Sequence, residues 1–252
     1  MDDLTCLTTQ GFDINAAVFL AEASAEAYSK EFATTPKWAK DRKFNPPHPF
    51  DTGNTQGFWA EGGDVALLSF RGTSNTGQWI RDLRLAPAFH KWGLVHRGFK
   101  TGVSVVEDQI AAFVKVAKGK KHVLITGHSL GGALAVLAAA NLKIEGIQSH
   151  LYTYGQPRAG YWNFADQFDY QLSGRLYRFI NQSDIVARVP PGLLFSHCGI
   201  PKRIVKPGTL ESGGDALPFA NPMPDAAYQP GPKSIQEGSG EGLPFALSLI
   251  HI

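Results

Sequence analysis

The chain has few cysteines, no long apolar run and almost no charge imbalance, and each shortage excludes a class of protein. Two cysteines, Cys6 and Cys198, are too few for a disulfide framework or a set of metal ligands. No apolar stretch approaches the roughly 18 residues of a membrane-spanning helix. A formal net charge of +2 gives no reason to expect nucleic acid or an anionic membrane as the main partner.

The N-terminal segment lacks the basic start of a signal peptide. It opens with the acidic residues Asp2 and Asp3, and no signal peptide is visible in the first thirty residues. From the sequence as written we expect a cytoplasmic protein, and secretion stays open if residues precede Met1. A small cluster of basic residues, Lys118, Lys120 and Lys121, falls where a helix should end. Its favourable interaction with the helix C-terminus explains it without a binding role.

Short apolar strands and helical patterns alternate along the chain. Apolar strand segments are predicted at 56–60, 65–70, 122–126, 151–154 and 176–180. Helical periodicity is predicted at 13–29, 98–117, 130–142 and 162–172. This order indicates a single α/β domain over residues 1–252, with a mostly parallel sheet and helices on both faces. Residues 34–55 are expected to form a loop, and 207–252 an irregular C-terminal segment.

One motif carries most of the chemistry: Gly127-His128-Ser129-Leu130-Gly131, between an apolar strand and an apolar helix. A sharp strand-to-helix turn leaves the serine strained and needs glycine two residues on either side. The turn lifts the Ser129 hydroxyl clear of the sheet, and the Leu130 amide points at the same space as an oxyanion donor. His128 is expected to point away from Ser129 and to pack. Ser129 is therefore the predicted nucleophile.

This segment resembles the class 3 lipases, a family that includes the secreted fungal triacylglycerol lipases. Four further stretches agree with the family in order along the chain. They are 69–74 with 79–83, His96-Arg97-Gly98-Phe99, the stretch 154–160, and 181–186 with 189–191. The resemblance covers residues 12–201 and implies an α/β-hydrolase fold.

The resemblance also implies roles for residues at the carboxyl ends of the strands, where open α/β sheets bind ligands. Thr73 would supply the second oxyanion donor. Asp184 would orient the catalytic histidine, and it follows Ser129 in the order nucleophile, acid, histidine. Asp166 and Asp169 compete for this role, but both fall in a predicted helix with solvent-facing options.

The segment 74–87 would be a short lid. Its apolar residues are Trp79, Ile80, Leu83 and Leu85, set against the polar Arg81, Asp82 and Arg84. Such a flap can cover a hydrophobic cleft in water and open against a lipid surface. The alternative is an ordinary surface helix packed on the core.

The histidine base is the least determined part of the site. Only His197 and His251 follow Asp184. The resemblance puts the base near the C-terminus, which favours His251, although a single residue follows it. The ending 248–252 also resembles translated adapter sequence, in which case the native histidine would be missing from this chain. Three sources for the base stay open: His251, His197 or a histidine lost by truncation.

Together these residues predict a serine hydrolase that cleaves carboxylic esters of lipids through an acyl-enzyme. A phospholipase A1 or a feruloyl-type esterase is the enzymatic alternative, because the same site serves all three. A catalytically inactive lipid-binding protein of the same fold is the alternative from another class. We expect no metal and no cofactor. The expected partners are a lipid ester substrate and, transiently, a lipid interface, with no nucleic acid and no specific protein partner.

Overall fold

The computed structural model describes residues 11–29, 36–73, 75–82, 85–181, 184–206 and 209–212. Two sheets and seven α-helices are found in this part of the chain. None of the described helices is long and apolar enough to cross a membrane.

The larger sheet has eight strands in the order β1-β2-β3-β6-β7-β9-β11-β12. Their bounds are β1 His48–Thr52, β2 Thr55–Gly62, β3 Val65–Phe70, β6 His122–His128, β7 His150–Tyr154, β9 Leu176–Asn181, β11 Ile200–Lys206 and β12 Thr209–Ser212. Strands β3, β6, β7, β9 and β11 pair in parallel, and the outer strands pair antiparallel. The predicted mostly parallel α/β sheet is confirmed. Its parallel strands end at one common edge, which we call the carboxyl edge.

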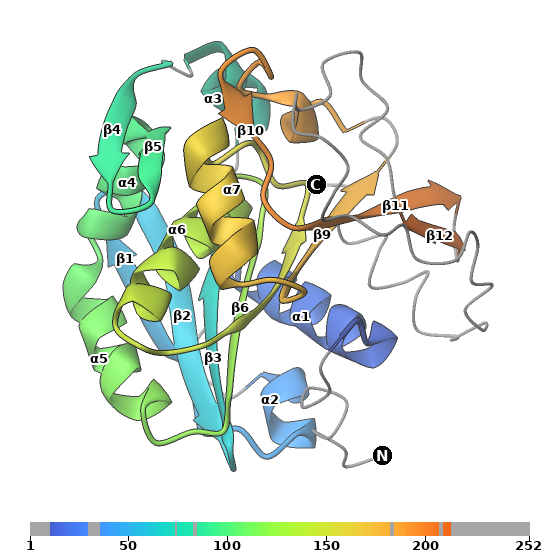
Figure 1. The fold of residues 1–252 in the computed structure, drawn as a ribbon. Helices are drawn as coiled ribbons and strands as arrows, with labels where there is room; N and C mark the ends of the chain where they lie inside the picture. Colours follow the sequence, from blue (N-terminus) through green and yellow to red (C-terminus); the bar gives the residue numbers. More distant parts are fainter. Residues whose placement is uncertain are drawn as a thin grey trace.

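Helices cover both faces of this sheet (Figure 1). One face carries α1 Ile14–Glu26 and α2 Lys37–Asp41, which share a core cluster with Phe58, Leu67 and Tyr154. The other face carries α4 Arg97–Ser104, α5 Glu107–Ala117, α6 Leu130–Ile144 and α7 Trp162–Gln171. Two separate apolar clusters result, one on each side of the sheet, as a sheet buried on both faces requires.

Helix α6 packs against the three central strands β3, β6 and β7. Eleven of its residues are buried, and most of these are alanine or glycine. Small side chains let the helix axis approach the sheet closely, so the N-terminus of α6 is held against the ends of the strands. This packing fixes the position of the Ser129 turn.

Two sequence-based predictions of local structure were wrong. The expected loop 34–55 contains α2 and β1, because a polar edge strand with one buried residue leaves little apolar signal. The expected helix 98–117 is two helices, α4 and α5, with a break at Val105 and Val106. Val106 is fully buried at that break, so the apolar pattern runs through it unchanged.

The prediction also omitted a second, four-stranded sheet in the order β10-β8-β5-β4. Its strands are β4 Pro87–His90, β5 Gly93–His96, β8 Gly160–Tyr161 and β10 Phe195–Ser196. Each is two to four residues long, too short for a periodic pattern to be recognised. Segments far apart in the sequence pair in this sheet.

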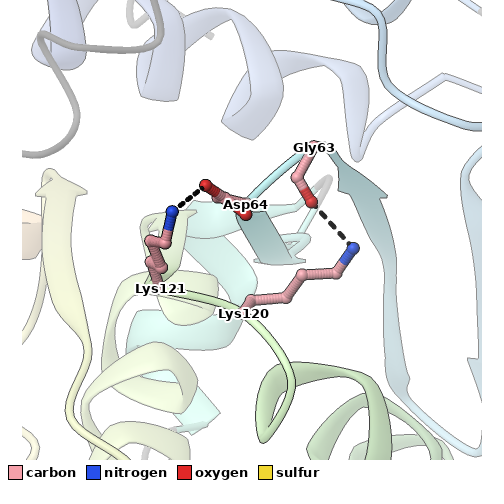
Figure 2. A network of polar contacts seen from close by, with 4 residues as sticks. All are labelled: Gly63, Asp64, Lys120 and Lys121. Carbon is pink, nitrogen blue, oxygen red and sulfur yellow. Dashed lines mark hydrogen bonds and ion pairs between the residues drawn. The ribbon is translucent and has the colours of Figure 1, made fainter.

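The lysine cluster lies at the edge opposite the carboxyl edge. Lys118 is the C-cap of α5, as expected, but its two neighbours reach the turn between β2 and β3. Figure 2 shows Lys120 donating to the Gly63 carbonyl, at 2.9 Å, and Lys121 contacting the Asp64 carboxylate, at 2.7 Å. Contacts with that turn, rather than the α5 terminus alone, explain the cluster.

Candidate active site

Ser129 forms the turn between β6 and α6. Its backbone has φ 55° and ψ −127°, which a residue with a side chain rarely adopts. A Cβ at Gly127 would stand 2.4 Å from the Gly131 carbonyl, and one at Gly131 would stand 2.2 Å from the Phe70 carbonyl oxygen. Both contacts are with backbone, which cannot move aside. Only glycine fits on either side of this serine, as the sequence predicted.

The Ser129 side chain is buried, but its hydroxyl makes no hydrogen bond in the described structure. The residue is 1% exposed, and its hydroxyl has no hydrogen-bond partner among the described residues. Its amide donates to the Tyr154 carbonyl at 2.9 Å, which fixes the turn against β7. A buried hydroxyl without a partner costs free energy, and at Ser129 this cost is combined with a strained backbone, which together call for an explanation.

The end of β3 lies directly beside this turn. A Cβ at Gly72 would stand 3.1 Å from the Ser129 Cβ, and Gly131 touches the backbone of Phe70 and Arg71. Thr73 therefore follows a residue in contact with Ser129. Its hydroxyl oxygen accepts from the Asn75 amide at 3.2 Å, which leaves the hydroxyl hydrogen to donate elsewhere.

Leu130 is the first residue of α6, so its amide has no partner within the helix. The amide lies at the positive end of a 15-residue helix dipole. Leu130 follows Ser129 and Thr73 follows Gly72, so the two residues predicted as oxyanion donors come from the adjacent ends of β6 and β3.

Asp184 lies after β9 at the same carboxyl edge. Its Oδ2 is 2.5 Å from where a Cβ at Gly155 would stand, and Gly155 follows Tyr154, the residue bonded to the Ser129 amide. Its Oδ1 accepts from the Val186 amide at 2.8 Å. Burial raises the pKa of this carboxyl, while backbone hydrogen bonds from Val186 and Ala187 and the nearby Arg188 partly oppose the rise. The competing Asp166 and Asp169 lie on α7.

The loop that carries Asp184 is anchored by a side chain whose role the sequence did not reveal. Arg158 donates to the carbonyls of Arg188 and of Pro190, the latter at 2.7 Å, and its amide donates to Val189 at 2.8 Å. Arg158 is 8% exposed. An arginine in a Gly- and Pro-rich stretch is a weak sequence signal for binding to backbone carbonyls. The sequence does not indicate which carbonyls Arg158 would bind.

His197 is fixed on the same loop. Its Nε2 lies 2.8 Å from the Ala187 carbonyl oxygen, so Nε2 carries the proton and donates it. Burial, with Arg178 and Arg158 nearby, holds the pKa of His197 well below its usual range. The other candidate base, His251, lies outside the described residues.

A cavity of about 710 Å³ opens next to the serine turn. Its wall includes Leu130, Leu134, Phe99, Val105 and Trp79. Trp79 belongs to α3 Thr76–Asp82, the helix at the predicted lid, and its ring stacks on Phe99 at 6.1 Å between centroids. Ile80 is half-buried beside it, whereas Leu83 lies outside the described residues. The wall is largely apolar and can hold an alkyl chain beside Leu130, the residue after Ser129.

The chemistry that this arrangement allows is acyl transfer. A buried hydroxyl lies at the turn before the first residue of a helix and close to the end of β3, with a carboxylate at the same edge of the sheet and an apolar cavity beside Leu130. Attack on an ester carbonyl requires a nucleophile, oxyanion donors and an acid, and residues of these types are present here.

Comparison with known proteins gives one family. A profile of the family described as Lipase (class 3) matches residues 67–193. The chain is 38% identical over 131 residues to a secreted mono- and diacylglycerol lipase of Fusarium solani. It is 39% identical over 147 residues to a lipase of Rhizomucor miehei. These matches cover 50% and 52% of this chain but only 39% of each relative, so the chain spans well under two thirds of their length.

Solved structures agree over a longer span. One is of a triacylglycerol lipase described as having a serine protease triad at its catalytic centre. It superposes with a TM-score of 0.70 at 29% identity and covers 79% of this chain and 83% of its own. A lipase from Rhizopus microsporus var. chinensis gives a TM-score of 0.68 at 26% identity, covering 76% and 74%.

Proposed function

The chain belongs to the class 3 lipase family, and from that premise we propose that it is a serine hydrolase which cleaves carboxylic esters of lipids. The observation that carries the proposal is the buried Ser129 hydroxyl, which has no hydrogen-bond partner in the described structure and belongs to the residue before Leu130, part of the wall of an apolar cavity. No structural role explains both the strain at Ser129 and its unused hydroxyl, whereas nucleophilic attack explains both.

The proposed reaction runs through an acyl-enzyme. Ser129 Oγ bonds to the ester carbonyl carbon and loses its proton to a histidine, and the carbonyl oxygen becomes an oxyanion held by Leu130 and Thr73. The carbon–oxygen bond to the alcohol then breaks, and the histidine returns the proton to that alcohol. Water repeats both steps on the acyl-enzyme and releases the fatty acid. Asp184 orients the histidine and stabilises its charged form.

We propose His251 as the base. His197 donates its Nε2 proton to the Ala187 carbonyl, and its charged form is disfavoured by burial. A base must carry a positive charge for part of the cycle, which the burial of His197 disfavours, and the Nε2 of His197 is already committed to the Ala187 carbonyl. His197 is better explained as a residue that holds the Asp184 loop.

We propose an acylglycerol as the substrate, with its acyl chain in the cavity beside Leu130. Relatives of this chain are named as mono- and diacylglycerol lipases and one as a triacylglycerol lipase. The cavity wall of Leu134, Phe99 and Val105 offers apolar contact along an alkyl chain. Hydrolysis should therefore become more efficient from short to medium acyl chains, measured as kcat/KM on a series of p-nitrophenyl esters.

The relatives also bear on location. Several of them are named as secreted, and the expectation of a cytoplasmic protein finds no support among them. We propose that this protein is secreted as well, which expression in its source cells and assay of the medium would test.

Hydrolysis of a short p-nitrophenyl ester by the parent and by Ser129→Ala tests the reaction. Loss of the nucleophile should lower kcat by roughly 10⁶-fold if the triad is complete. Ser149→Ala is a matched control, because Ser149 is also buried and its hydroxyl also lacks a partner in the described part of the chain. Equal activity of Ser129→Ala and Ser149→Ala would reject the proposal.

His251→Ala and His197→Ala separate the candidate bases. We expect His251→Ala to be inactive and His197→Ala to keep part of its activity with a lower melting temperature. The reverse result would make His197 the base. An inactive but folded parent would mean that the base is absent from this chain, because the chain is either truncated or an inactive lipid-binding protein. A longer chain with a further histidine that restores ester turnover would decide for truncation.

A further inference from the structure

Tyr28 joins two parts of the site that come from distant segments. It follows α1, just beyond the C-cap Ala27, and α1 packs against β6 and β7. The Tyr28 hydroxyl lies 2.8 Å from Nδ1 of His128, the residue before Ser129. The two residues are separated by 100 positions in the sequence.

The same hydroxyl touches the turn that carries Thr73. A Cβ at Gly72 would stand 2.2 Å from the Tyr28 hydroxyl oxygen, 2.6 Å from the His128 carbonyl oxygen and 3.1 Å from the Ser129 Cβ. Three segments therefore meet at Gly72: the end of β3, the Ser129 turn and the residue after α1. A glycine is required there because any side chain would occupy the place of the tyrosine hydroxyl.

Both side chains are neutral, so the tautomer of His128 sets the direction of their hydrogen bond. Burial lowers the pKa of His128 to about 4, so its ring is neutral and has one acceptor nitrogen. Burial raises the pKa of Tyr28 to about 12, against opposing effects of a hydrogen bond from the Gly72 backbone and of Arg71. With the His128 proton on Nε2, the phenol donates to Nδ1, and its oxygen accepts from the Gly72 backbone.

The Tyr28 ring is held on its other side. The Arg71 guanidinium carbon lies 5.3 Å from the ring centroid, within the range of a cation–π contact. Arg71 in turn donates to the Gln56 side chain, and its amide donates to the Gln56 carbonyl at 2.8 Å. The tyrosine is fixed to β2 and β3 as well as to the turn before α6.

We propose that Tyr28 is a positioning residue for ester hydrolysis, which sets the spacing between the Thr73 turn and the Ser129 turn. The proposal rests on the function proposed above. Oxyanion donors act only when both lie about 2.7–3.1 Å from the developing charge. Leu130 and Thr73 belong to separate strand ends, so a bridge between those ends keeps the two donors in register.

Tyr28→Phe tests the bridge, because it removes the hydroxyl and keeps the ring. We expect kcat on a p-nitrophenyl ester to fall roughly tenfold to a hundredfold with little change in KM, since a misplaced donor weakens transition-state contacts more than substrate binding. The inhibition constant of a trifluoromethyl ketone, which forms an oxyanion on Ser129, should rise by a similar factor. Tyr177→Phe is the control, because it likewise removes a hydroxyl that is hydrogen-bonded within the fold, at 3.0 Å to the Gly174 carbonyl, away from the site.

Variants of His128 test the partner. His128→Leu removes the acceptor, so it should resemble Tyr28→Phe, and the double variant should be little worse than either single one. His128→Asn keeps an acceptor near the Nδ1 position and should recover part of kcat. Fully additive losses would show that the two side chains act separately and would overturn the bridge.

Chemical shifts test the role of Tyr28 independently of whether the protein hydrolyses esters. In ¹H–¹⁵N spectra, Tyr28→Phe should shift the amides of Thr73 and Leu130 and the ring nitrogens of His128, and Tyr177→Phe should leave them in place. Unshifted Thr73 and Leu130 amides would reject the bridge whether or not the parent hydrolyses esters. A lower melting temperature with wild-type kcat and inhibition constant would also reject it, because Tyr28 would then only support the fold.

Discussion

At the scale of single residues, the candidate site contains groups whose conformation or burial is unfavourable for folding. Ser129 is strained and its hydroxyl is unused by the described residues, and Asp184 is a carboxylate kept partly away from water. Such features reduce stability and persist where function requires them. Removing them should therefore separate activity from stability.

Asp184→Asn is expected to lower kcat by about 10⁴-fold, because the histidine would lose the carboxylate that orients it. The pKa of Asp184 is raised in the folded state, so its contribution to stability is present at low pH and lost as the pH rises through the folded pKa. The neutral amide should then make the folded protein more stable than the parent at pH 7. Thermal unfolding at pH 7, with circular dichroism as the probe, checks this. A lower melting temperature for the variant would contradict it.

His128 gives the opposite pH dependence. Its pKa falls from 6.5 to about 4 on folding, so the folded state loses stability as the pH drops from 6.5 towards 4. At about 1.4 kcal/mol per pKa unit, the full effect is roughly 3 kcal/mol. Urea unfolding at pH 7 and pH 4.5 checks this with the parent and His128→Asn. The free energy of unfolding of the parent, relative to that of the variant, should be smaller at pH 4.5 than at pH 7. His150, whose pKa is also lowered to about 4 by burial, stays the same in both proteins. A constant difference would show that His128 is not buried as described.

At the scale of elements, the turn between β6 and α6 depends on how closely α6 approaches β3. Gly131 is the point of contact, where a Cβ would meet the Phe70 carbonyl oxygen at 2.2 Å. Neither backbone can yield without moving a central strand or the helix that carries the oxyanion donor.

Gly131→Ala should therefore destabilise the protein by about 3 kcal/mol and lower kcat at least tenfold. The added methyl group would clash with a backbone carbonyl, which cannot move aside as a flexible side chain could. Gly119→Ala is the control, because a Cβ there would lie 3.6 Å from its nearest neighbour, at ordinary contact distance. Denaturant midpoints and p-nitrophenyl ester kinetics of both variants check this. A Gly131→Ala variant as stable and active as Gly119→Ala would mean that α6 lies farther from β3.

At the scale of the whole molecule, the two edges of the large sheet carry different groups of residues. The carboxyl edge gathers Ser129, Thr73 and Asp184 from three strand ends, while the opposite edge holds the lysine contacts of Figure 2. Lys120 also pairs with Glu61 at 2.6 Å and so ties the start of β6 to the β2–β3 hairpin.

Lys121→Ala should leave kcat and KM unchanged and shift the melting temperature little, because its pair with Asp64 is solvent-exposed and is screened by water and salt. Ester kinetics and thermal unfolding at low and high salt check this. A large loss of activity would show that the two edges are coupled through the central strands.

The sequence alone predicted the elements whose formation depends on residues close together in the chain. The glycines around Ser129 predict the turn, because the steric conflict that they relieve lies within five residues. Apolar runs predict β3 and β6, since helices cover both faces of the sheet that contains them, and the apolar, small-residue run from Leu130 predicts α6. Asp184 could be placed at the carboxyl edge because it follows a strand parallel to the one before Ser129.

Contacts between distant segments were decided only by the tertiary structure. Tyr28 fits the helical pattern of α1 as one more apolar position, and only the packing of α1 on β6 brings it to His128. Arg158 and His197 hold the Asp184 loop through backbone carbonyls, which carry no sequence signal. The four short strands of the second sheet form because α4, α7 and the loop after Asp184 bring them together, and no strand of two to four residues is stable alone. Local sterics therefore determined the strained turn at Ser129, and long-range packing determined what surrounds it.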